Sequence, residues 1–391
     1  MRSVPVGGLA HPPKWAGPEE AGARHLYVHL PFCASRCGYC DFVTVVGRDG
    51  QHEAYVSALL TELALERAVL APRLESVFLG GGTPTLTEPR ALSRLLQALP
   101  PAEEVTVEAN PETVTPALAR LLQGCGVTRV SLGAQTFQPR LLEMLDRRAS
   151  TDDVRRAVYA LCDARIDNIS LDLIYGIPGQ SPADLDADLS EALALGPEHV
   201  SCYELEAKPG TRFTHAHGAE LARQATAMEW YFERVVERLT AVGYRWYETA
   251  NFCRLPAAAD GRDLRSRHNL AYWRGRDYLG LGIGAVSTIE GRRWRNTPRL
   301  GRYLATLAAG ERPHREVETL SEPVRRSERV LLGLRLDEPL TLDGLDGALD
   351  ATAVERLERL GLVDRRHGAE ALALTERGRF LGGGVTAELL A

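Results

Sequence analysis

From His25 onward, short apolar runs alternate with longer amphipathic stretches. The apolar runs predict six strands, at His25–Leu30, Glu75–Leu79, Glu104–Ala109, Val127–Leu132, Asn168–Ile174 and His199–Leu205. The stretches between them predict helices, including Gln51–Val69, Pro89–Ala98, Pro116–Gln123, Asp152–Ala164 and Pro182–Ala194. Such alternation is typical of a parallel sheet covered by helices. The pattern therefore predicts an α/β fold built on a partial (β/α)6 barrel, with a doubly wound sheet as the alternative.

Polar and glycine-rich residues lie in or just after the carboxyl-terminal parts of these strands. They are Gly80-Gly81-Gly82-Thr83-Pro84, Glu108-Ala109-Asn110-Pro111, Gln135, Asp172, and the group Tyr203, Glu204 and Glu206. In β/α barrels the carboxyl ends of the strands carry the functional site. Each feature also has a purely structural reading, because glycines allow a tight strand exit and carboxylates cap helices. Their common position is what predicts a site at this edge.

After the first predicted strand come three cysteines, Cys33, Cys37 and Cys40, which together span eight residues. Cysteine thiolates are the usual protein ligands of iron–sulfur clusters, and three of them would leave one iron of a [4Fe–4S] cluster open. A structural zinc site normally takes four ligands. His29 or Asp41 would complete such a set, so zinc remains an alternative. A disulfide is disfavoured, because no secretory signal is present and the cysteines indicate a reducing compartment.

The composition narrows the function classes. The chain has 391 residues, of which 45% are hydrophobic and 25% charged, as in ordinary globular proteins. Its net charge of −6 gives no basic footprint for nucleic acid. No apolar run approaches the roughly 18 residues of a membrane span. We expect a cytoplasmic monomer or weak dimer with no integral membrane segment, although transient membrane association remains open.

The spacing Cys-x-x-x-Cys-x-x-Cys after a strand resembles the radical S-adenosylmethionine (SAM) superfamily. In that superfamily SAM chelates the open iron, and the reduced cluster cleaves it to a 5′-deoxyadenosyl radical. The match narrows to the coproporphyrinogen-oxidase-like branch. That resemblance implies cofactor binding by Tyr27, Tyr39, Gly81, Gly82, Thr83, Glu108, Gln135, Arg147 and Asp172. The chemistry is suitable, since carboxylates bind ribose hydroxyls and arginine binds a carboxylate.

The second half carries the segment His268-Asn269-Leu270-Ala271-Tyr272-Trp273. By itself such a histidine is more often a core residue. The segment resembles the signature of the radical SAM heme chaperones, the HemW family, which implies heme binding through His268 beside Tyr272 and Trp273. Phe42 stands where the oxygen-independent coproporphyrinogen oxidases have a fourth cysteine, which also favours the chaperones. Val286 departs from the histidine that the chaperones usually have there.

The resemblance implies a protein that binds heme and passes it to heme-requiring proteins, without deciding whether SAM is cleaved. The enzyme alternatives are radical decarboxylation of the propionates of coproporphyrinogen III and a related radical SAM reaction such as methyl transfer. The alternative without catalysis is a winged-helix regulator with a vestigial cluster. The intact glycine turn, Glu108 and Asp172 argue against that reading.

We predict four parts along the chain: a flexible arm at 1–22, a radical SAM core at 23–250, a connecting region at 251–311 and a winged-helix-like domain at 312–391. A long amphipathic helix is expected at Gly218–Val242, with its apolar stripe in the core. In the last part we expect helices at Pro323–Leu334, Thr341–Leu349 and Thr352–Leu360, followed by a hairpin around His367-Gly368. The third of these helices mixes Glu and Arg, which favours docking over DNA binding.

Overall fold

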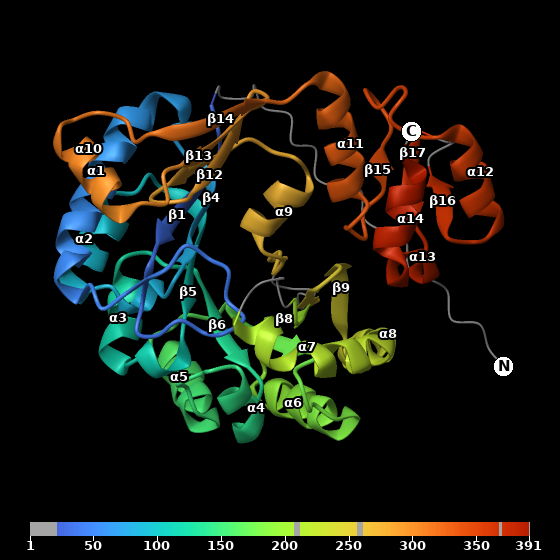
Figure 1. Ribbon diagram of the computed structural model, residues 1–391, viewed down its shortest axis with the longest axis horizontal. Coiled ribbons are helices and arrows are strands. Elements are labelled where there is room, and N and C mark those ends of the chain that lie inside the picture. The colour runs from blue at the N-terminus through green and yellow to red at the C-terminus, as the bar shows by residue number, and fades with distance from the viewer. Residues whose placement is uncertain (1–21, 207–211, 256–260, 367–369, 391) are drawn as a thin grey trace.

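The computed structural model describes residues 22–206, 212–255, 261–366 and 370–390, and it contains a large curved sheet (Figure 1). Six parallel strands form its centre in the order β1-β4-β5-β6-β7-β8. Their bounds are β1 His25–Leu30, β4 Leu74–Gly81, β5 Ala102–Ala109, β6 Arg129–Gln135, β7 Ile169–Tyr175 and β8 His199–Glu204. All six predicted strands are therefore confirmed within a few residues, and the parallel pairing confirms the barrel-like α/β architecture.

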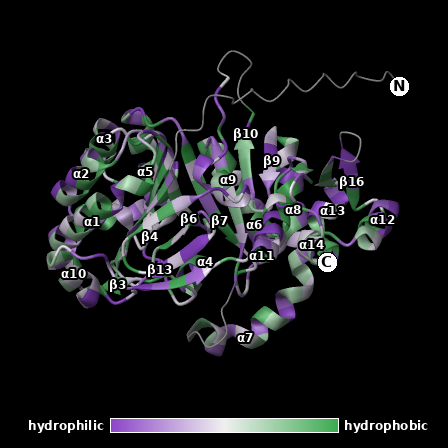
Figure 2. Cartoon of the chain, turned by 90° about the horizontal axis from the view of Figure 1, so that it is seen from above, coloured by the Kyte–Doolittle hydropathy of each residue, from purple (hydrophilic) through white to green (hydrophobic). Residues whose placement is uncertain are grey.

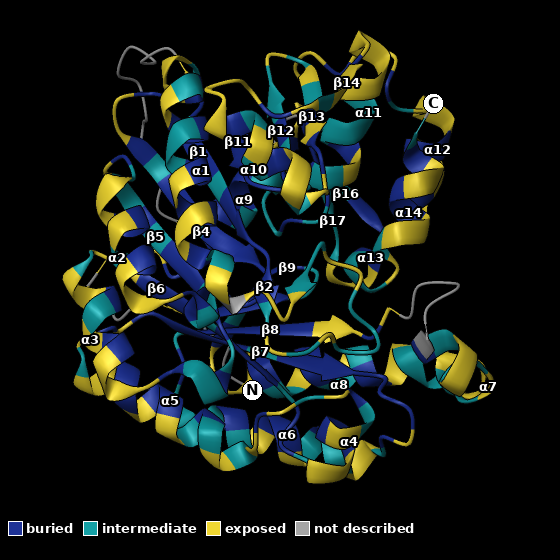
Figure 3. Cartoon of the chain, turned by 60° about the vertical axis from the view of Figure 1, so that its left-hand side comes forward, coloured by how far each residue is buried: buried dark blue, intermediate teal, exposed yellow. Residues whose placement is uncertain are grey.

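Helices between these strands cover the outer face of the sheet. They are α1 His52–Glu66, α2 Pro89–Ala98, α3 Pro116–Gly124, α4 Pro139–Met144, α5 Thr151–Asp163 and α6 Pro182–Leu195. Local sequence fixes where several begin. At α5 and α6, Ser150 and Ser181 each accept the amide of an aspartate three residues on, and that aspartate accepts the serine amide in return. Figure 3 shows the central strands as the most buried layer.

The sheet is wider than predicted, with 12 strands in all. Beyond β1 it continues with β11 Tyr278–Leu281, β12 Val286–Ile289, β13 Arg292–Asn296 and β14 Arg315–Thr319, and beyond β8 with β10 Asn251–Arg254 and β9 Tyr244–Glu248. Strand β11 runs parallel to β1, whereas the other added strands are antiparallel to their neighbours. Helix α10 Leu300–Ala308 packs on α1. A short parallel pair, β2 Phe32–Cys33 and β3 Val45–Val46, carries the first cysteine.

The expected helix Gly218–Val242 is instead two helices, α7 Arg212–Gln224 and α8 Met228–Ala241, joined by a 3₁₀ turn at Ala225–Ala227. Helix α8 places Tyr231, Val235, Val236 and Leu239 in the core, as the apolar stripe predicts. Helix α7 projects from the body of the chain (Figures 2 and 3). Both helices are amphipathic, and the alternation of apolar and polar residues continues through the 3₁₀ turn. The sequence periodicity therefore does not show where α7 ends and α8 begins.

The C-terminal part has its own apolar core around Val330, Leu357 and Leu372. It contains helices α11 Glu322–Gly333, α12 Ala351–Arg359, α13 Glu376–Phe380 and α14 Gly382–Leu389, and strands β15 Leu340–Thr341, β16 Val363–Arg366 and β17 Ala371–Leu374. The three strands form a small antiparallel sheet in the order β15-β17-β16. The predicted hairpin strands are confirmed, while its turn at His367-Gly368 and the N-terminal arm lie outside the described residues.

The predicted helix at Thr341–Leu349 is wrong. Thr341 ends strand β15, and the residues that follow form turns. Gly344 and Gly347 adopt φ of 70° and 73°, a left-handed conformation that ends a helix. Strand β14 belongs to the large sheet, so the region after residue 312 still contributes to the main body before the small sheet begins. The domain boundaries themselves stay a prediction.

Candidate functional site

The three cysteines lie on the loop that leaves β1. Cys33 ends β2, and Cys37 and Cys40 follow on a turn in which the Cys40 amide donates to the Cys37 carbonyl at 3.2 Å. All three are free and half-buried. Burial raises the pKa of Cys33 and of Cys40, and the neighbouring thiols add to the rise. The thiols therefore influence one another's ionisation, and their thiolate forms need a nearby positive charge to be stable.

No three His, Cys, Asp or Glu side chains in the described part of the chain converge as ligands of a single metal ion. A cubane cluster makes a different demand, because each cysteine binds a separate iron and the sulfurs are spread accordingly. Two donors point at these sulfurs. Thr83 Oγ1 donates to Cys33 Sγ at 3.7 Å, and Arg147 Nη1 donates to Cys37 Sγ at 3.9 Å. Donors aimed at thiols suit thiolate ligands of an anionic cluster.

The glycine turn after β4 is packed so closely that it excludes side chains. Gly81 has φ of 111°, and a Cβ atom there would lie 2.4 Å from the His29 imidazole. A Cβ atom on Gly82 would lie 2.6 Å from the carbonyl oxygen of Pro31. His29 is itself fixed, since its Nε2 donates to Val43 O at 2.8 Å and its Nδ1 accepts from Tyr27 at 3.0 Å. The turn thus brings backbone amides close to the cysteine loop.

Two half-buried carboxylates, Glu108 and Asp172, lie on β5 and β7, with β6 between these two strands. Glu108 accepts the Gly81 amide at 3.0 Å, and burial, reinforced by the charge of Asp172, raises the pKa of Glu108 to about 7. Burial also raises the pKa of Asp172, against the hydrogen bonds that Ser131 Oγ donates at 2.9 and 3.0 Å. These carboxylates are desolvated acceptors of the kind that bind hydroxyl groups.

Arg147 lies between the cysteine loop and strand ends β5 and β6. Its Nη2 donates to Asn110 Oδ1 at 2.8 Å and to Gly133 O at 3.0 Å. Its Nε is buried and has no hydrogen-bond partner among the described residues. An arginine donor left over beside the cysteine loop fits the carboxylate of an amino acid ligand.

The remaining predicted cofactor residues surround this group. Gln135 ends β6 with φ of 65°, where the register with β7 shifts. Tyr27 stacks on Phe78 with ring centroids 6.2 Å apart, and burial raises the pKa of Tyr27 well above its ordinary value. Tyr39 packs edge-on against Phe213 of α7 at 6.3 Å. The SAM and cluster candidates therefore gather at the carboxyl ends of the strands, as predicted.

His268 lies beside Tyr27, with ring centroids 6.3 Å apart. It belongs to α9 Arg267–Trp273, which lies between the two ends of the curved sheet (Figure 1), and its side chain is 1% exposed. His268 Nδ1 is 2.9 Å from Ser76 Oγ, Nε2 is 3.0 Å from the Tyr272 hydroxyl, and the ring stacks on Phe78 at 5.0 Å. Burial lowers its pKa to about 3. The imidazole is therefore neutral and both nitrogens are engaged.

A buried polar chain connects the start of α9 to Asp172. The Ser266 amide donates to the Tyr247 hydroxyl at 3.2 Å, and that hydroxyl lies 2.8 Å from His199 Nε2. His199 Nδ1 lies 2.8 Å from Ser170 Oγ, which donates to Asp172 at 3.2 Å. Because the amide can only donate and the carboxylate can only accept, every proton in the chain points towards Asp172. The sequence patterns gave no signal for Tyr247 or His199.

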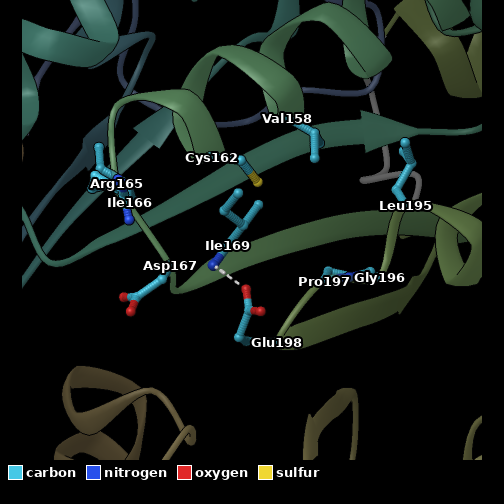
Figure 4. A pocket seen from close by; sticks show the side chains of 10 residues that line it. All are labelled: Val158, Cys162, Arg165, Ile166, Asp167, Ile169, Leu195, Gly196, Pro197 and Glu198. Atoms are coloured by element: carbon cyan, nitrogen blue, oxygen red, sulfur yellow. Dashed lines mark hydrogen bonds between the residues drawn. The ribbon is translucent and has the colours of Figure 1, made fainter.

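A pocket of about 310 Å³ lies away from all these residues (Figure 4). It is lined by residues at the end of α5 and before β7 and β8, including Cys162 and Glu198, and Glu198 Oε2 accepts the Ile169 amide at 3.0 Å. It lies at the amino ends of the strands, so we do not place the functional site there. None of the helices in the described ranges is long and apolar enough to cross a bilayer.

Residues 27–192 match the model of the radical SAM superfamily. The fold and the site therefore define a radical SAM protein, and the superfamily implies a [4Fe–4S] cluster and SAM as cofactors. The heme chaperone HemW of Mycobacterium tuberculosis strain H37Rv is 37% identical over 93% of this chain and 94% of its own. That of Bacillus subtilis is 32% identical over 92% and 97%. The chain belongs to the family of the heme chaperone HemW.

A solved structure, coproporphyrinogen III oxidase from Escherichia coli, superposes with a TM-score of 0.78 over 94% of this chain and 90% of the oxidase. Its sequence identity is 22%, so the match confirms the fold alone. The Escherichia coli heme chaperone HemW is 34% identical over 76% of this chain and 79% of its own.

Proposed function

We propose that Cys33, Cys37 and Cys40 hold a [4Fe–4S] cluster and that SAM occupies its open iron. Thr83 and Arg147 donate to two of the thiols, and the glycine turn brings backbone close to the same loop. When bound, the cluster supplies the site that chelates SAM. Arg147 Nε would then donate a hydrogen bond to the carboxylate of SAM. Glu108 and Asp172 would accept hydrogen bonds from its ribose hydroxyls. Tyr27, Tyr39 and Gln135 complete the proposed cofactor site.

The proposed task of the protein is to bind heme and to pass it to heme-requiring proteins. The observation that carries this proposal is the match of heme chaperones to more than nine-tenths of the chain. The residue at the fourth cysteine position agrees, because Phe42 offers no thiol and its side chain is 61% exposed beside the cluster loop. Decarboxylation of coproporphyrinogen III is the second candidate, supported by the shared fold.

His268 is the proposed axial ligand of heme, and the structure sets a condition on that role. A heme iron needs a free imidazole nitrogen. Nε2 already contacts Tyr272 and Nδ1 contacts Ser76, in a side chain with almost no exposure. We infer that α9 must separate from β4 before His268 reaches heme, with Trp273 moving together with the helix.

The test is an anaerobic titration of the cluster-loaded chain with heme. We expect stoichiometric binding by the wild type, weaker binding by His268→Ala and unchanged binding by His314→Ala, an exposed histidine before β14. Absence of heme binding by the wild type contradicts the chaperone proposal. Conversion of coproporphyrinogen by the same sample under reducing conditions, with SAM present, assigns the oxidase function instead.

A further inference from the structure

Asn110 directly follows β5, and neither the proposed cluster ligation nor the proposed SAM binding gives it a role. Its Nδ2 donates to Thr83 Oγ1 at 3.0 Å, and its Oδ1 accepts from Arg147 Nη2 at 2.8 Å. Thr83 Oγ1 in turn donates to Cys33 Sγ, and Arg147 Nη1 donates to Cys37 Sγ. Asn110 is therefore the centre of a hydrogen-bonded chain that joins two of the three thiols.

The direction of every bond in this chain is determined. A guanidinium has donors only, so Arg147 must face the amide oxygen of Asn110. The amide nitrogen then faces Thr83 and donates to it. Thr83 has one proton, and with its oxygen accepting from Asn110 that proton is directed to Cys33 Sγ. The orientation of one side-chain amide thus decides whether Cys33 receives a hydrogen bond.

The backbone holds Asn110 in place. Its carbonyl accepts the Thr113 amide at 3.0 Å and the Thr113 hydroxyl at 2.7 Å, and Pro111 restricts its φ and ψ. We propose that Asn110 is a positioning residue that aims the Thr83 proton at Cys33 and the Arg147 guanidinium at Cys37, and thereby sets the reduction potential of the cluster. Hydrogen bonds to the sulfurs are among the factors that set such potentials.

The inference rests on the proposed ligation by Cys33, Cys37 and Cys40 and is independent of heme. The informative variant is Asn110→Asp. Its carboxylate accepts from both neighbours, so the Thr83 proton turns away from Cys33 and the midpoint potential becomes more negative. Thr83→Val, which removes that proton, shifts the potential in the wild-type background and adds no further shift in the Asn110→Asp background. Such non-additivity identifies a shared interaction.

The measurements are iron and sulfide content and the midpoint potential from an electron paramagnetic resonance titration of the full chain. The matched control is Asn168→Ala, since Asn168 also accepts from a buried arginine, Arg129 Nη1 at 2.9 Å, but at the amino end of the sheet. A more negative midpoint potential in Asn110→Asp at wild-type iron content, with a wild-type potential in Asn168→Ala, supports the proposal.

Three results overturn it. The first is a wild-type potential in Asn110→Asp at wild-type iron content. The second is an equal effect of Thr83→Val in both backgrounds, and the third is an equal shift of the midpoint potential in Asn168→Ala. A wild-type chain that takes up no iron through its cysteines overturns the ligation as well, which distinguishes the two failures.

Discussion

Replacing Gly81 with alanine puts a methyl group where the imidazole of His29 already lies. The added Cβ would be 2.4 Å from two ring atoms of His29, about 1 Å inside ordinary van der Waals contact. The φ of 111° adds strain of about 1–3 kcal/mol for a residue with a side chain. His29 must also move away from Tyr27 and Val43, at a cost of about 1 kcal/mol for each hydrogen bond. The total loss of stability is about 3–5 kcal/mol.

Urea denaturation of the cluster-free chain, followed by circular dichroism, measures this loss. Gly124→Ala is the matched control, because Gly124 lies at the end of α3 with nothing within 4 Å of its would-be Cβ. That control changes stability by less than about 1 kcal/mol. The displaced His29 also shifts Val43 of the cysteine loop, so Gly81→Ala binds less iron on reconstitution. A loss below about 1 kcal/mol, with normal iron, refutes the close packing that we describe.

Three further outcomes follow from the site. In Cys40→Ala, reconstitution yields less iron than in the wild type, whereas Cys162→Ala, an exposed cysteine on α5, keeps wild-type iron; equal iron in both variants contradicts the ligand set. The pKa of His268 falls from 6.5 to about 3 on folding. Below pH 6.5 the histidine is therefore protonated in the unfolded chain and still neutral in the native state. The stability that neutral His268 contributes is therefore present above pH 6.5 and lost as the pH falls, by about 1.4 kcal/mol for each pH unit. The difference in unfolding free energy between the wild type and His268→Asn should narrow by about that amount from pH 7.5 to 5.5, and an unchanged difference refutes the neutral buried imidazole. Tyr272→Phe removes the hydroxyl from Nε2 and should tighten heme binding about fivefold, the value of one net hydrogen bond; unchanged affinity in the titration argues against ligation by His268.

The sequence predicts the parallel strands because these strands are buried in the sheet and therefore consist of short runs of apolar residues. It does not predict β11, whose Gly280 and neighbouring glycines suggest a turn. Distant partners on α1 hold the residues just beyond that strand: Glu62 accepts the Gly282 amide at 2.9 Å, and the Tyr55 hydroxyl accepts the Ile283 amide at 3.0 Å. Contacts over more than 200 residues leave no local signal.

The site shows the same division. Residue types and spacing predict the thiols, the glycine turn and the two carboxylates, and the structure brings these candidates to one edge. Asn110 stands in the segment that the sequence singles out, but only the contacts to Thr83 and Arg147 give it a role. For His268 the motif predicts an available ligand, whereas the fold buries it, because Phe78 and Ser76 of β4 complete its surroundings.

In the series of hydrogen bonds from Ser266 to Asp172, every donor points in the same direction, towards Asp172. Hydrogen bonds in series strengthen one another, so the charge at the last acceptor contributes to every bond before it. A ligand that neutralises Asp172 or forms a hydrogen bond with it therefore weakens the hydrogen bond from the Ser266 amide to Tyr247, at the start of α9. This effect requires no movement of the backbone between the two residues. Ser170, His199 and Tyr247 thus link Asp172 to the start of α9 through hydrogen bonds alone.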